Sequence, residues 1–579
     1  MPKNITKAKH RFPLRQIRHL PVTFRRYWPI ILLLIITLSL AFLNYEPGTF
    51  LIGWDNLSSE LAPAINLKRA LFSVWEEYQS LGLLGGIGHA ADLPRVFVLY
   101  LFSLIPGLPV SLFRYLSTFF PLVLGPIGTY LFLYHRLFKN KLDSRTSQSA
   151  SFLGGLFYLL NLATMQTFFT PFESFVYFYG AFPFLLYFLT GYLESPRFFS
   201  LIVIFLLSFF SSPSFYIETI FVVFCLLLIP IFIDTLLSQK NKIASLKKIA
   251  ASLFSITVPN LFWLLPVIFF VITNGQVGVQ AKINLVTSPE TYLRNLQFGN
   301  LLDIALLKGF FFNFLDLSGL GKFDYLLSVW RTHLAIPFIG IIGFLLFAIV
   351  IVGCYYSITK KFSWTKSLFG ILVTCLFFLL GGGLIINTAL PLAGELFRSP
   401  FTKFSTPLSF TYACFFSIGT VFLLDLFTFL HNRFTYPLTL FTVSLLLVVF
   451  MSPAFSGNFI DSNMRLTLPQ EYLDLFSYLH TQDSATRIAN FPQYTFWGWN
   501  YYDWGYRGSG FLWYGIKQPI LDRAFDVWDR SSEKYYEEVS SAIFSNNQTE
   551  FEKIIDKYAI NWVLLDKHVI SPDGKTDLG

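Results

Sequence analysis

The sequence predicts an α-helical polytopic membrane protein with about eleven transmembrane helices and a small α/β domain at the carboxyl end. Hydrophobic residues make up 54% of the chain and charged residues only 13%, whereas a soluble domain usually carries about a quarter charged residues. Apolar runs of membrane-spanning length recur along most of the chain, and short basic segments separate several of them. These observations favour a lipid environment over a large aqueous core.

The amino terminus predicts the orientation of the first helix. Residues 1–26 contain eight Lys and Arg and no acidic residue, and the apolar run Tyr27–Leu43 follows without a clear small-residue cleavage site. Because positive charge is retained in the cytoplasm, we expect residues 1–26 to be cytoplasmic and this run to be the first span of a multi-pass plasma-membrane protein. This topology explains the formal charge of +9 better than nucleic acid binding does.

The remaining apolar runs give ten further crossings. They are residues 112–134, 150–170, 174–193, 198–212, 214–236, 249–272, 333–358, 367–388, 405–430 and 435–452. The basic segments 136–145, 240–248, 360–366 and 431–433 all reach the cytoplasmic side only if one span separates Asn44 from Arg136. The short, proline-interrupted run 94–108 is therefore expected to be re-entrant or interfacial. The carboxyl terminus is then extracytoplasmic.

Three regions follow from this topology. They are the basic cytoplasmic segment 1–26, a transmembrane domain 27–452 with outer loops 44–111 and 273–332, and an extracytoplasmic carboxyl-terminal domain 453–579. In the last region charged residues return, residues 469–480 and 531–544 are typical of amphipathic helices, and residues 560–565 are typical of a short buried strand. A truncated carboxyl end is one expectation for a domain of this size.

The most distinctive local feature is Gly53-Trp54-Asp55-Asn56, shortly after the first span. A carboxylate just above the membrane surface can accept a proton from a hydroxyl group or bind a divalent cation. Asp55 is therefore a candidate catalytic base. The equally natural alternative is a simple turn, with Trp54 in the interfacial aromatic belt.

The same outer loop offers further candidate substrate-binding residues, which are Asn56, Glu60, Arg69 and His89. Apolar residues near helical spacing over 60–80 predict a helix lying in the membrane interface. No metal site is predicted, because all four cysteines lie in apolar runs and the eight histidines show no zinc-binding spacing. A divalent cation at the outer carboxylates is the one cofactor left open.

Two other outer segments carry candidate binding residues. Arg398 and Lys403 lie in the outer loop before the run 405–430, against the positive-inside bias, and can hold an anionic headgroup or phosphate. The alternative is a pair of headgroup anchors. Trp497 and Trp499 belong to an aromatic-rich stretch whose rings can stack on sugars, although an aromatic core is equally natural.

Several stretches resemble signatures of a known group of enzymes. They are residues 53–68 with Arg69-Ala70-Leu71 and Trp75, residues 82–88, Pro94, Gly107-Leu108-Pro109, residues 125–130, residues 260–266 and residues 397–401. Over roughly residues 27–450 the chain resembles GT-C membrane glycosyltransferases, in particular the α-(1→3)-arabinofuranosyltransferase-like group. In such enzymes an essential acidic residue of the first outer loop lies near the membrane, and Asp55 matches it by position. The chain has one acid there, where some GT-C families have an adjacent pair.

The resemblance implies a GT-C-like fold and an inverting glycosyltransferase. Such an enzyme moves a sugar from a polyprenyl-phosphate donor to a cell-envelope glycan, glycolipid or protein acceptor, with Asp55 as base and Arg398 and Lys403 stabilising the leaving phosphate. A transporter or flippase of lipid-linked sugars is the alternative, but it predicts paired ionisable groups near the midplane and internal repeats, and the sequence offers few. A non-catalytic membrane protein of envelope assembly is a third possibility.

Overall fold

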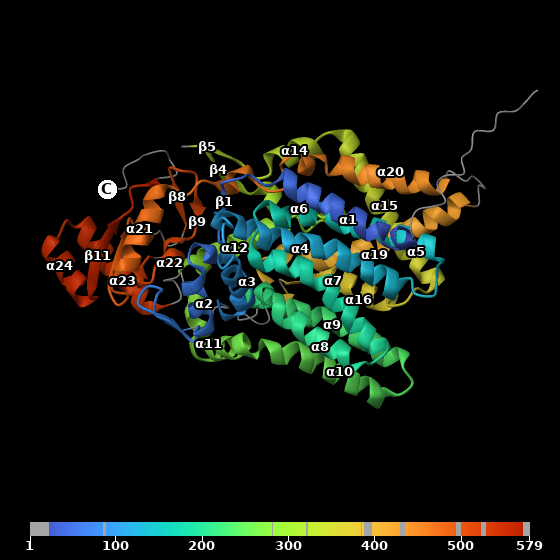
Figure 1. Cartoon of the computed structure of the whole chain (residues 1–579), viewed down its shortest axis with the longest axis horizontal. Coiled ribbons are helices and arrows are strands. Elements are labelled where there is room, and N and C mark those ends of the chain that lie inside the picture. The colour runs from blue at the N-terminus through green and yellow to red at the C-terminus, as the bar shows by residue number, and fades with distance from the viewer. Residues whose placement is uncertain are drawn as a thin grey trace, which may run out of the picture.

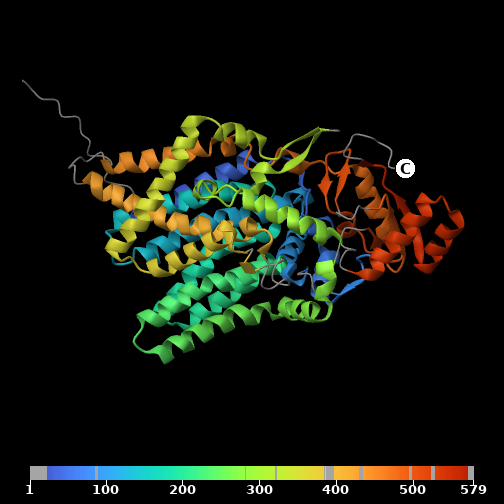
Figure 2. The same ribbon diagram turned by 180° about the vertical axis from the view of Figure 1, so that it is seen from behind.

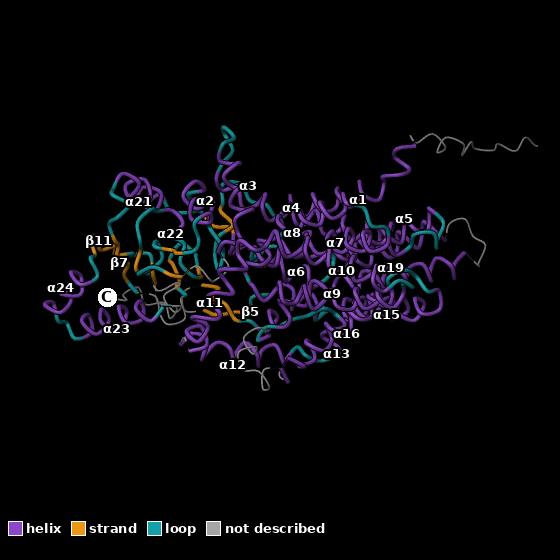
Figure 3. Tube along the Cα trace, turned by 90° about the horizontal axis from the view of Figure 1, so that it is seen from below, coloured by secondary structure: helices purple, strands orange, loops and turns teal. Residues whose placement is uncertain are grey.

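The computed structural model describes residues 22–84, 89–280, 282–319, 322–383, 385–386, 397–428, 435–493, 499–522 and 529–570. The molecule is elongated, with a bundle of long helices at one end and the strands and shorter helices at the other (Figures 1 and 3). Seen from behind, the carboxyl-terminal segment again lies beyond one end of the bundle (Figure 2). Apolar sequence therefore forms one half of the molecule and charged sequence the other.

The helices are α1 (Val22–Leu43), α2 (Pro63–Leu71), α3 (Leu93–Ser103), α4 (Val110–Phe132), α5 (Ser144–Leu159), α6 (Leu162–Phe169), α7 (Glu173–Glu194), α8 (Phe198–Phe210), α9 (Glu218–Ser238), α10 (Lys242–Thr257), α11 (Leu261–Gln280), α12 (Lys282–Gln297), α13 (Leu301–Ala305), α14 (Ser328–Leu334), α15 (Pro337–Lys360), α16 (Thr365–Phe377), α19 (Pro400–Thr428), α20 (Thr435–Phe450), α21 (Gln470–Thr481), α22 (Leu512–Gly515), α23 (Arg530–Phe544) and α24 (Gln548–Lys557). The strands are β1 (Phe50–Leu51), β2 (Trp75–Glu76), β3 (Leu83–Leu84), β4 (Leu315–Gly319), β5 (Lys322–Tyr325), β6 (Arg465–Leu466), β7 (Arg487–Phe491), β8 (Asn500–Tyr502), β9 (Arg507–Gly508), β10 (Ile520–Leu521), β11 (Ile560–Leu565) and β12 (Val569–Ile570).

The membrane-spanning character of the bundle is clear. Among the described residues, seven helices are long and apolar enough to cross a membrane, or eight if α5 and α6, bent by 42°, form one span. Three shorter apolar helices, in α1, α8 and α20, coincide with other predicted runs. At 1.5 Å per residue, a helix the length of α8 covers only about 20 Å of the roughly 30 Å hydrocarbon layer. The number of eleven crossings stays a prediction.

The first outer loop differs from its predicted form. The helix expected over 60–80 is wrong beyond Leu71, where α2 ends and the chain turns into the β2–β3 hairpin. Positive φ angles at Ser80 (52°) and Gly82 (95°) reverse the chain between the two strands, which a helix cannot accommodate. The run 94–108 contains α3, a short helix that packs against α2 and α4, and its re-entrant or interfacial placement stays a prediction.

Contacts divide the connecting segments into two sets. At one end of the bundle Glu194 accepts a hydrogen bond from the Trp364 indole at 2.7 Å and lies 3.4 Å from Lys139. At the other end the Asn56 amide donates to the Pro171 carbonyl at 2.6 Å. The Ser212 hydroxyl donates to the Ala91 carbonyl there, so three predicted outer segments meet at this end. These sets agree with the alternation predicted from charge. Which end faces the cytoplasm stays a prediction.

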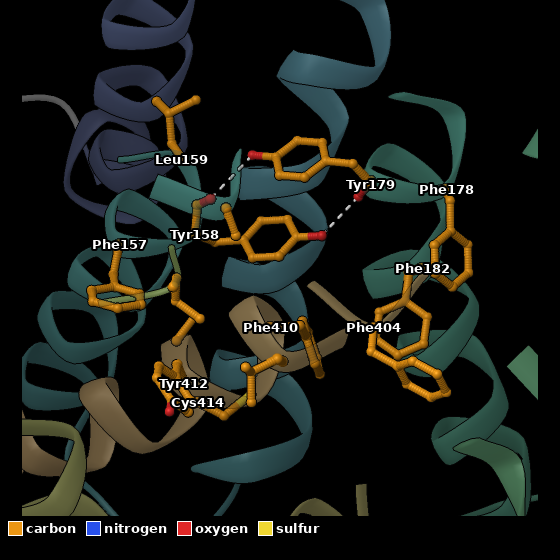
Figure 4. Packing of buried hydrophobic residues seen from close by; sticks show 14 of the residues in the cluster. Phe157, Tyr158, Leu159, Phe178, Tyr179, Phe182, Phe404, Phe410, Tyr412 and Cys414 are labelled. Atoms are coloured by element: carbon orange, nitrogen blue, oxygen red, sulfur yellow. Dashed lines mark hydrogen bonds between the residues drawn. The ribbon is translucent and has the colours of Figure 1, made fainter. Parts of the chain in front are cut away.

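Polar groups inside the bundle are satisfied locally. Tyr158 and Tyr179 stack with ring centroids 4.5 Å apart, and each hydroxyl donates to the backbone carbonyl of the other residue, at 2.9 and 3.3 Å (Figure 4). Phe157, Phe182 and Phe410 belong to the same buried cluster. Because hydrocarbon offers no hydrogen-bond partners, this reciprocal pairing lets two phenols lie inside an apolar bundle.

Two glycines allow α15 and α19 to approach closely. A Cβ on Gly353 would lie 1.7 Å from the Phe415 carbonyl oxygen, and a Cβ on Gly419 would lie 2.1 Å from the Ile349 carbonyl oxygen. Small residues at such crossings let helix backbones pack against each other without lipid between them. The two helices are therefore held by van der Waals packing along a shared seam.

The outer layer is built jointly by the carboxyl-terminal segment and the first loop. α21, α23 and β11 occupy the segments predicted as two amphipathic helices and a strand. The prediction that this strand is buried is wrong, because successive side chains point to opposite faces and Val563 and Leu565 are 57% and 62% exposed. β7 lies between β10 and β11 in a parallel sheet, which a bridge from Gln79 to Ile520 extends into the first loop. Ile52 and Leu57 of the loop also belong to the apolar cluster of this layer. The boundary at residue 453 stays a prediction.

Candidate active site

A buried cluster of charges supports the first outer loop. Glu173, at the start of α7, accepts a hydrogen bond from Arg114 and lies 3.7 Å from Arg95. Arg95 also pairs with Asp92 at 2.6 Å, and Arg114 lies 3.5 Å from Glu60. All five side chains are at most 6% exposed. The cluster therefore connects two parts of the first loop to α4 and α7.

The residues that hold the first loop also fix the turn that carries Asp55. The Leu57 amide donates to Glu173 Oε2 at 3.3 Å, and Asn56 is fixed to Pro171. Just before Asp55, Trp54 has a φ of 53°, a left-handed conformation that is costly for a bulky residue. Such strain persists only where the surrounding contacts impose it. Asp55 is thus presented by a turn that is held on both sides.

The carboxyl-terminal segment holds the other side of this turn. The Trp54 amide donates to the Arg507 carbonyl at 2.6 Å, and the Ser509 amide donates to the Trp54 carbonyl at 3.2 Å. Gly508 lies opposite Trp54, and a Cβ there would be 2.2 Å from the Trp54 carbonyl oxygen. Only glycine permits so close an approach of two backbones.

The Asp55 carboxyl group combines accessibility with a perturbed pKa. Its side chain is exposed, although dense protein surrounds the rest of it. Burial raises its pKa above the ordinary value of 3.8, while a hydrogen bond from Ser509 and the charge of Arg398 act in the opposite direction. A carboxyl group can keep one open face while most of the volume around it is protein. An accessible acid of raised pKa is suited to accept a proton.

Aromatic rings from three segments of the chain meet at Trp54, the residue before Asp55. Trp54 packs against Phe314 of the 273–332 loop, with ring centroids 5.1 Å apart, and against Trp499 of the carboxyl-terminal segment at 5.4 Å. The guanidinium of Arg294, in α12, lies 5.0 Å from the Phe314 ring centre. Aromatic faces bind the apolar faces of sugars, and guanidinium groups bind phosphates. The residues packed around Trp54 therefore combine both chemistries.

Arg507 joins the 273–332 loop to this site. It is 5% exposed, and its guanidinium lies 2.6 Å from Asp316 and 2.9 Å from Asp461. Burial raises the pKa of both carboxyl groups, and Arg507 opposes that shift. The arginine thus fixes one strand of the carboxyl-terminal segment to two other parts of the outer layer.

The other predicted site residues lie at varying distances from this arrangement. Arg398 acts on Asp55, and Trp499 packs on Trp54, whereas Lys403 is buried in the second turn of α19. Trp497 lies outside the described residues. Asn56 and Glu60 are buried among the contacts that hold the first loop against the helices. Their predicted contact with substrate stays a prediction.

Arg69 and His89 contact the protein itself. Arg69 donates to the carbonyls of Trp513 and Ile516, at 2.5 and 2.7 Å, and so holds α2 against the carboxyl-terminal segment. Burial lowers the pKa of Arg69 to about 10, so it remains charged at neutral pH. His89 pairs with Glu76 at 2.5 Å. A substrate-binding role for either residue stays a prediction.

Sequence reasoning missed several residues that build the site. Ser509, Arg507 and Asp316 have no local signature, because their roles arise from contacts between distant segments. Arg114 did carry a signal, since it is a charge inside a predicted apolar run, where ionisable residues usually have partners. Within the part of the chain that the structure describes, no group of three or more His, Cys, Asp or Glu could hold a metal ion.

Comparison with known proteins identifies the fold. No family model and no curated protein sequence matches this chain. The structure is similar to the arabinofuranosyltransferase AftD from mycobacteria, with a TM-score of 0.55 and 14% identity over 94% of this chain and 35% of that one. A mutant form of AftD gives 0.50 and 13% identity over 86% and 33%. A weaker similarity, with a TM-score of 0.46 and 13% identity over 94% and 70%, is to the oligosaccharyltransferase AglB from Archaeoglobus fulgidus.

The fold is therefore that of the GT-C membrane glycosyltransferases. At this level of identity the likeness is one of fold. The chain spans about a third of the length of the AftD structures that it matches.

The buried charge cluster gives a first test. Glu173→Gln keeps the shape of the side chain but leaves Arg114 with only the more distant Glu60 as a charged partner, and we expect it to lower the free energy of unfolding by about 3 to 5 kcal/mol. The matched control is Glu550→Gln, because Glu550 pairs with Lys553 where both side chains are more than half exposed. We expect that change to cost less than about 0.5 kcal/mol. Thermal unfolding of the detergent-solubilised protein measures both, and equal melting temperatures would show that the cluster is not a structural support.

Proposed function

We propose that this chain is a GT-C glycosyltransferase that transfers a sugar from a polyprenyl-phosphate donor to an acceptor hydroxyl group of a cell-envelope glycan, glycolipid or protein. The observation that carries the proposal is Asp55, an accessible carboxyl group whose raised pKa is opposed by the charge of Arg398 and which follows Trp54, a residue packed against aromatic rings of two other segments. Four separate segments converge on it, within the fold of a sugar-transferring enzyme.

The proposed reaction inverts the configuration at the anomeric carbon of the sugar. Asp55 takes the proton of the acceptor hydroxyl while the hydroxyl oxygen forms a bond to the anomeric carbon. The bond from that carbon to the phosphate oxygen breaks, and the polyprenyl phosphate leaves with the electron pair. Arg398 stabilises the negative charge that develops on the phosphate, and Lys403 adds to the positive potential of the same segment.

Membrane-spanning helices suit a sugar donor that carries a polyprenyl tail. A polyprenyl tail is soluble only in lipid, so an enzyme that accepts it must open its site sideways to the bilayer. The seven or eight spanning helices among the described residues supply such a surface next to the outer layer. A bound divalent cation would act as a further partner for the phosphate.

The proposed orientation puts the Asp55 site outside the cytoplasm. It is motivated by the basic segments that alternate along the chain. In a protein whose four native cysteines are replaced by alanine, Ser545→Cys should react with a membrane-impermeant maleimide in intact cells. Lys141→Cys, which is equally exposed at the other end of the molecule, should react only after lysis. The reverse pattern would place the site in the cytoplasm and contradict the proposed topology.

Replacement of Asp55 tests the base directly. Asp55→Asn keeps the shape but cannot accept the proton, and we expect turnover of a polyprenyl-phosphate sugar to fall about a hundredfold to ten-thousandfold. Because the folded pKa is raised, the stability contributed by protonated Asp55 is present at low pH and is lost as pH rises through that pKa. The variant should therefore melt at or above the wild-type temperature at pH 7. Near-normal turnover would show that Asp55 is a turn residue and is not the base.

Arg398 is expected to act on the donor. Arg398→Ala should weaken donor binding and lower turnover more than Arg398→Lys does, because lysine keeps the charge but loses the bidentate geometry of the guanidinium. The difference is measured by titrating purified protein with the lipid-linked sugar. If the wild type and Arg398→Ala bind the donor equally well, Arg398 serves as a headgroup anchor.

A further inference from the structure

The carboxyl-terminal segment lies backbone to backbone against the turn of the candidate base. The two hydrogen bonds that flank Trp54 fix Arg507 and Ser509 on either side of it. The absence of a side chain at Gly508 brings these backbones into direct contact. The position of Ser509 relative to Asp55 is therefore set by the main chain and does not depend on flexible side chains.

We propose that Ser509 is a positioning residue for Asp55, whose carboxylate it holds by a hydrogen bond in the orientation that receives the acceptor proton. This inference rests on the proposed role of Asp55 as base. The Ser509 hydroxyl donates to the Trp54 carbonyl at 3.4 Å, next to Asp55 in sequence, and it also lowers the pKa of the Asp55 carboxyl group as a hydrogen-bond donor. The hydroxyl donates to one acceptor at a time, and a charged carboxylate is a stronger acceptor than a carbonyl, so ionisation of Asp55 draws the hydroxyl toward the carboxylate.

Buried contacts keep Ser509 in place. Arg507, two residues earlier, is held by Asp316 and Asp461 and donates to the Leu317 carbonyl at 2.9 Å. The Tyr506 hydroxyl donates to the Ser509 carbonyl. A polar group acts reliably on a reacting atom only when its own support is rigid. The last segment of the chain thus completes a site whose base comes from the first outer loop.

The expected kinetic effect is specific. A hydrogen bond to the ionised form lowers the pKa of a carboxyl group, so Ser509→Ala should raise the pKa of Asp55 and move the acid limb of the pH–rate profile to higher pH. We expect kcat to fall about tenfold to a hundredfold, the range of a charge-assisted hydrogen bond, with little change in KM. Ser509→Thr keeps the hydroxyl group and should restore the wild-type profile. Ser477→Ala is the matched control, because Ser477 is an exposed serine of α21 that donates to its own helix.

A second measurement does not depend on activity. The difference in melting temperature between the wild type and Asp55→Asn should change as pH passes through the folded pKa of Asp55. The same difference between Ser509→Ala and the double variant Ser509→Ala/Asp55→Asn should change at a higher pH. Ser477→Ala should leave that pH where it is in the wild type.

The outcomes separate this inference from the proposed function. An inactive Asp55→Asn together with both shifts in Ser509→Ala supports both. If Asp55→Asn is inactive but Ser509→Ala keeps the wild-type pH profile and melting behaviour, Ser509 has no positioning role and the proposed base stands. If Asp55→Asn keeps its turnover, the base and the positioning role are both overturned, whatever the melting curves show.

Discussion

The outer layer depends on one constraint, which is the need to balance buried charge around Glu173. Three acidic and two basic side chains lie almost entirely out of water there, and each arginine requires a carboxylate at close range. Burial raises the pKa of Glu60, with Arg114 and Arg95 opposing the shift, so Glu60 is a member that can be neutral. Such a cluster adds little net stability but strongly penalises any arrangement that separates its members. It therefore selects one position of the first loop on α4 and α7.

The site above this cluster has a different electrostatic character. Asp55 keeps an open face, whereas the carboxylates beneath it are sealed and paired. A carboxylate enclosed by arginine partners cannot reach an acceptor hydroxyl, so the members of the cluster are not placed to act as a base. Holding the first loop and presenting an open carboxyl group are therefore tasks of different residues. Charges that hold the loop lie inside, and the charge available for chemistry lies at the surface beside Arg398.

The parts that could be predicted from the sequence are those with a local cause. Apolar runs predicted most helices of the bundle, and two amphipathic patterns and one apolar run predicted α21, α23 and β11. Asp55 was a candidate because a short polar turn stands shortly after the first apolar run, and its role as base stays a prediction. Ser509 could not be identified, because its contact with Asp55 joins segments about 455 residues apart. The helix expected over 60–80 failed for the same reason, since β2 and β3 belong to the layer formed with residues of the tail.

The long separation between Trp54 and Ser509 also has a consequence for synthesis of the protein. A ribosome adds about 5 to 20 residues each second, so the 455 residues between these two partners take about 20 to 90 s to produce. During that interval the first outer loop has already emerged, with β1 lacking β6 and Ile52 lacking the apolar cluster that later covers it. Assembly of the turn that carries Asp55 becomes a late event, completed only after Arg507 and Ser509 have been synthesised.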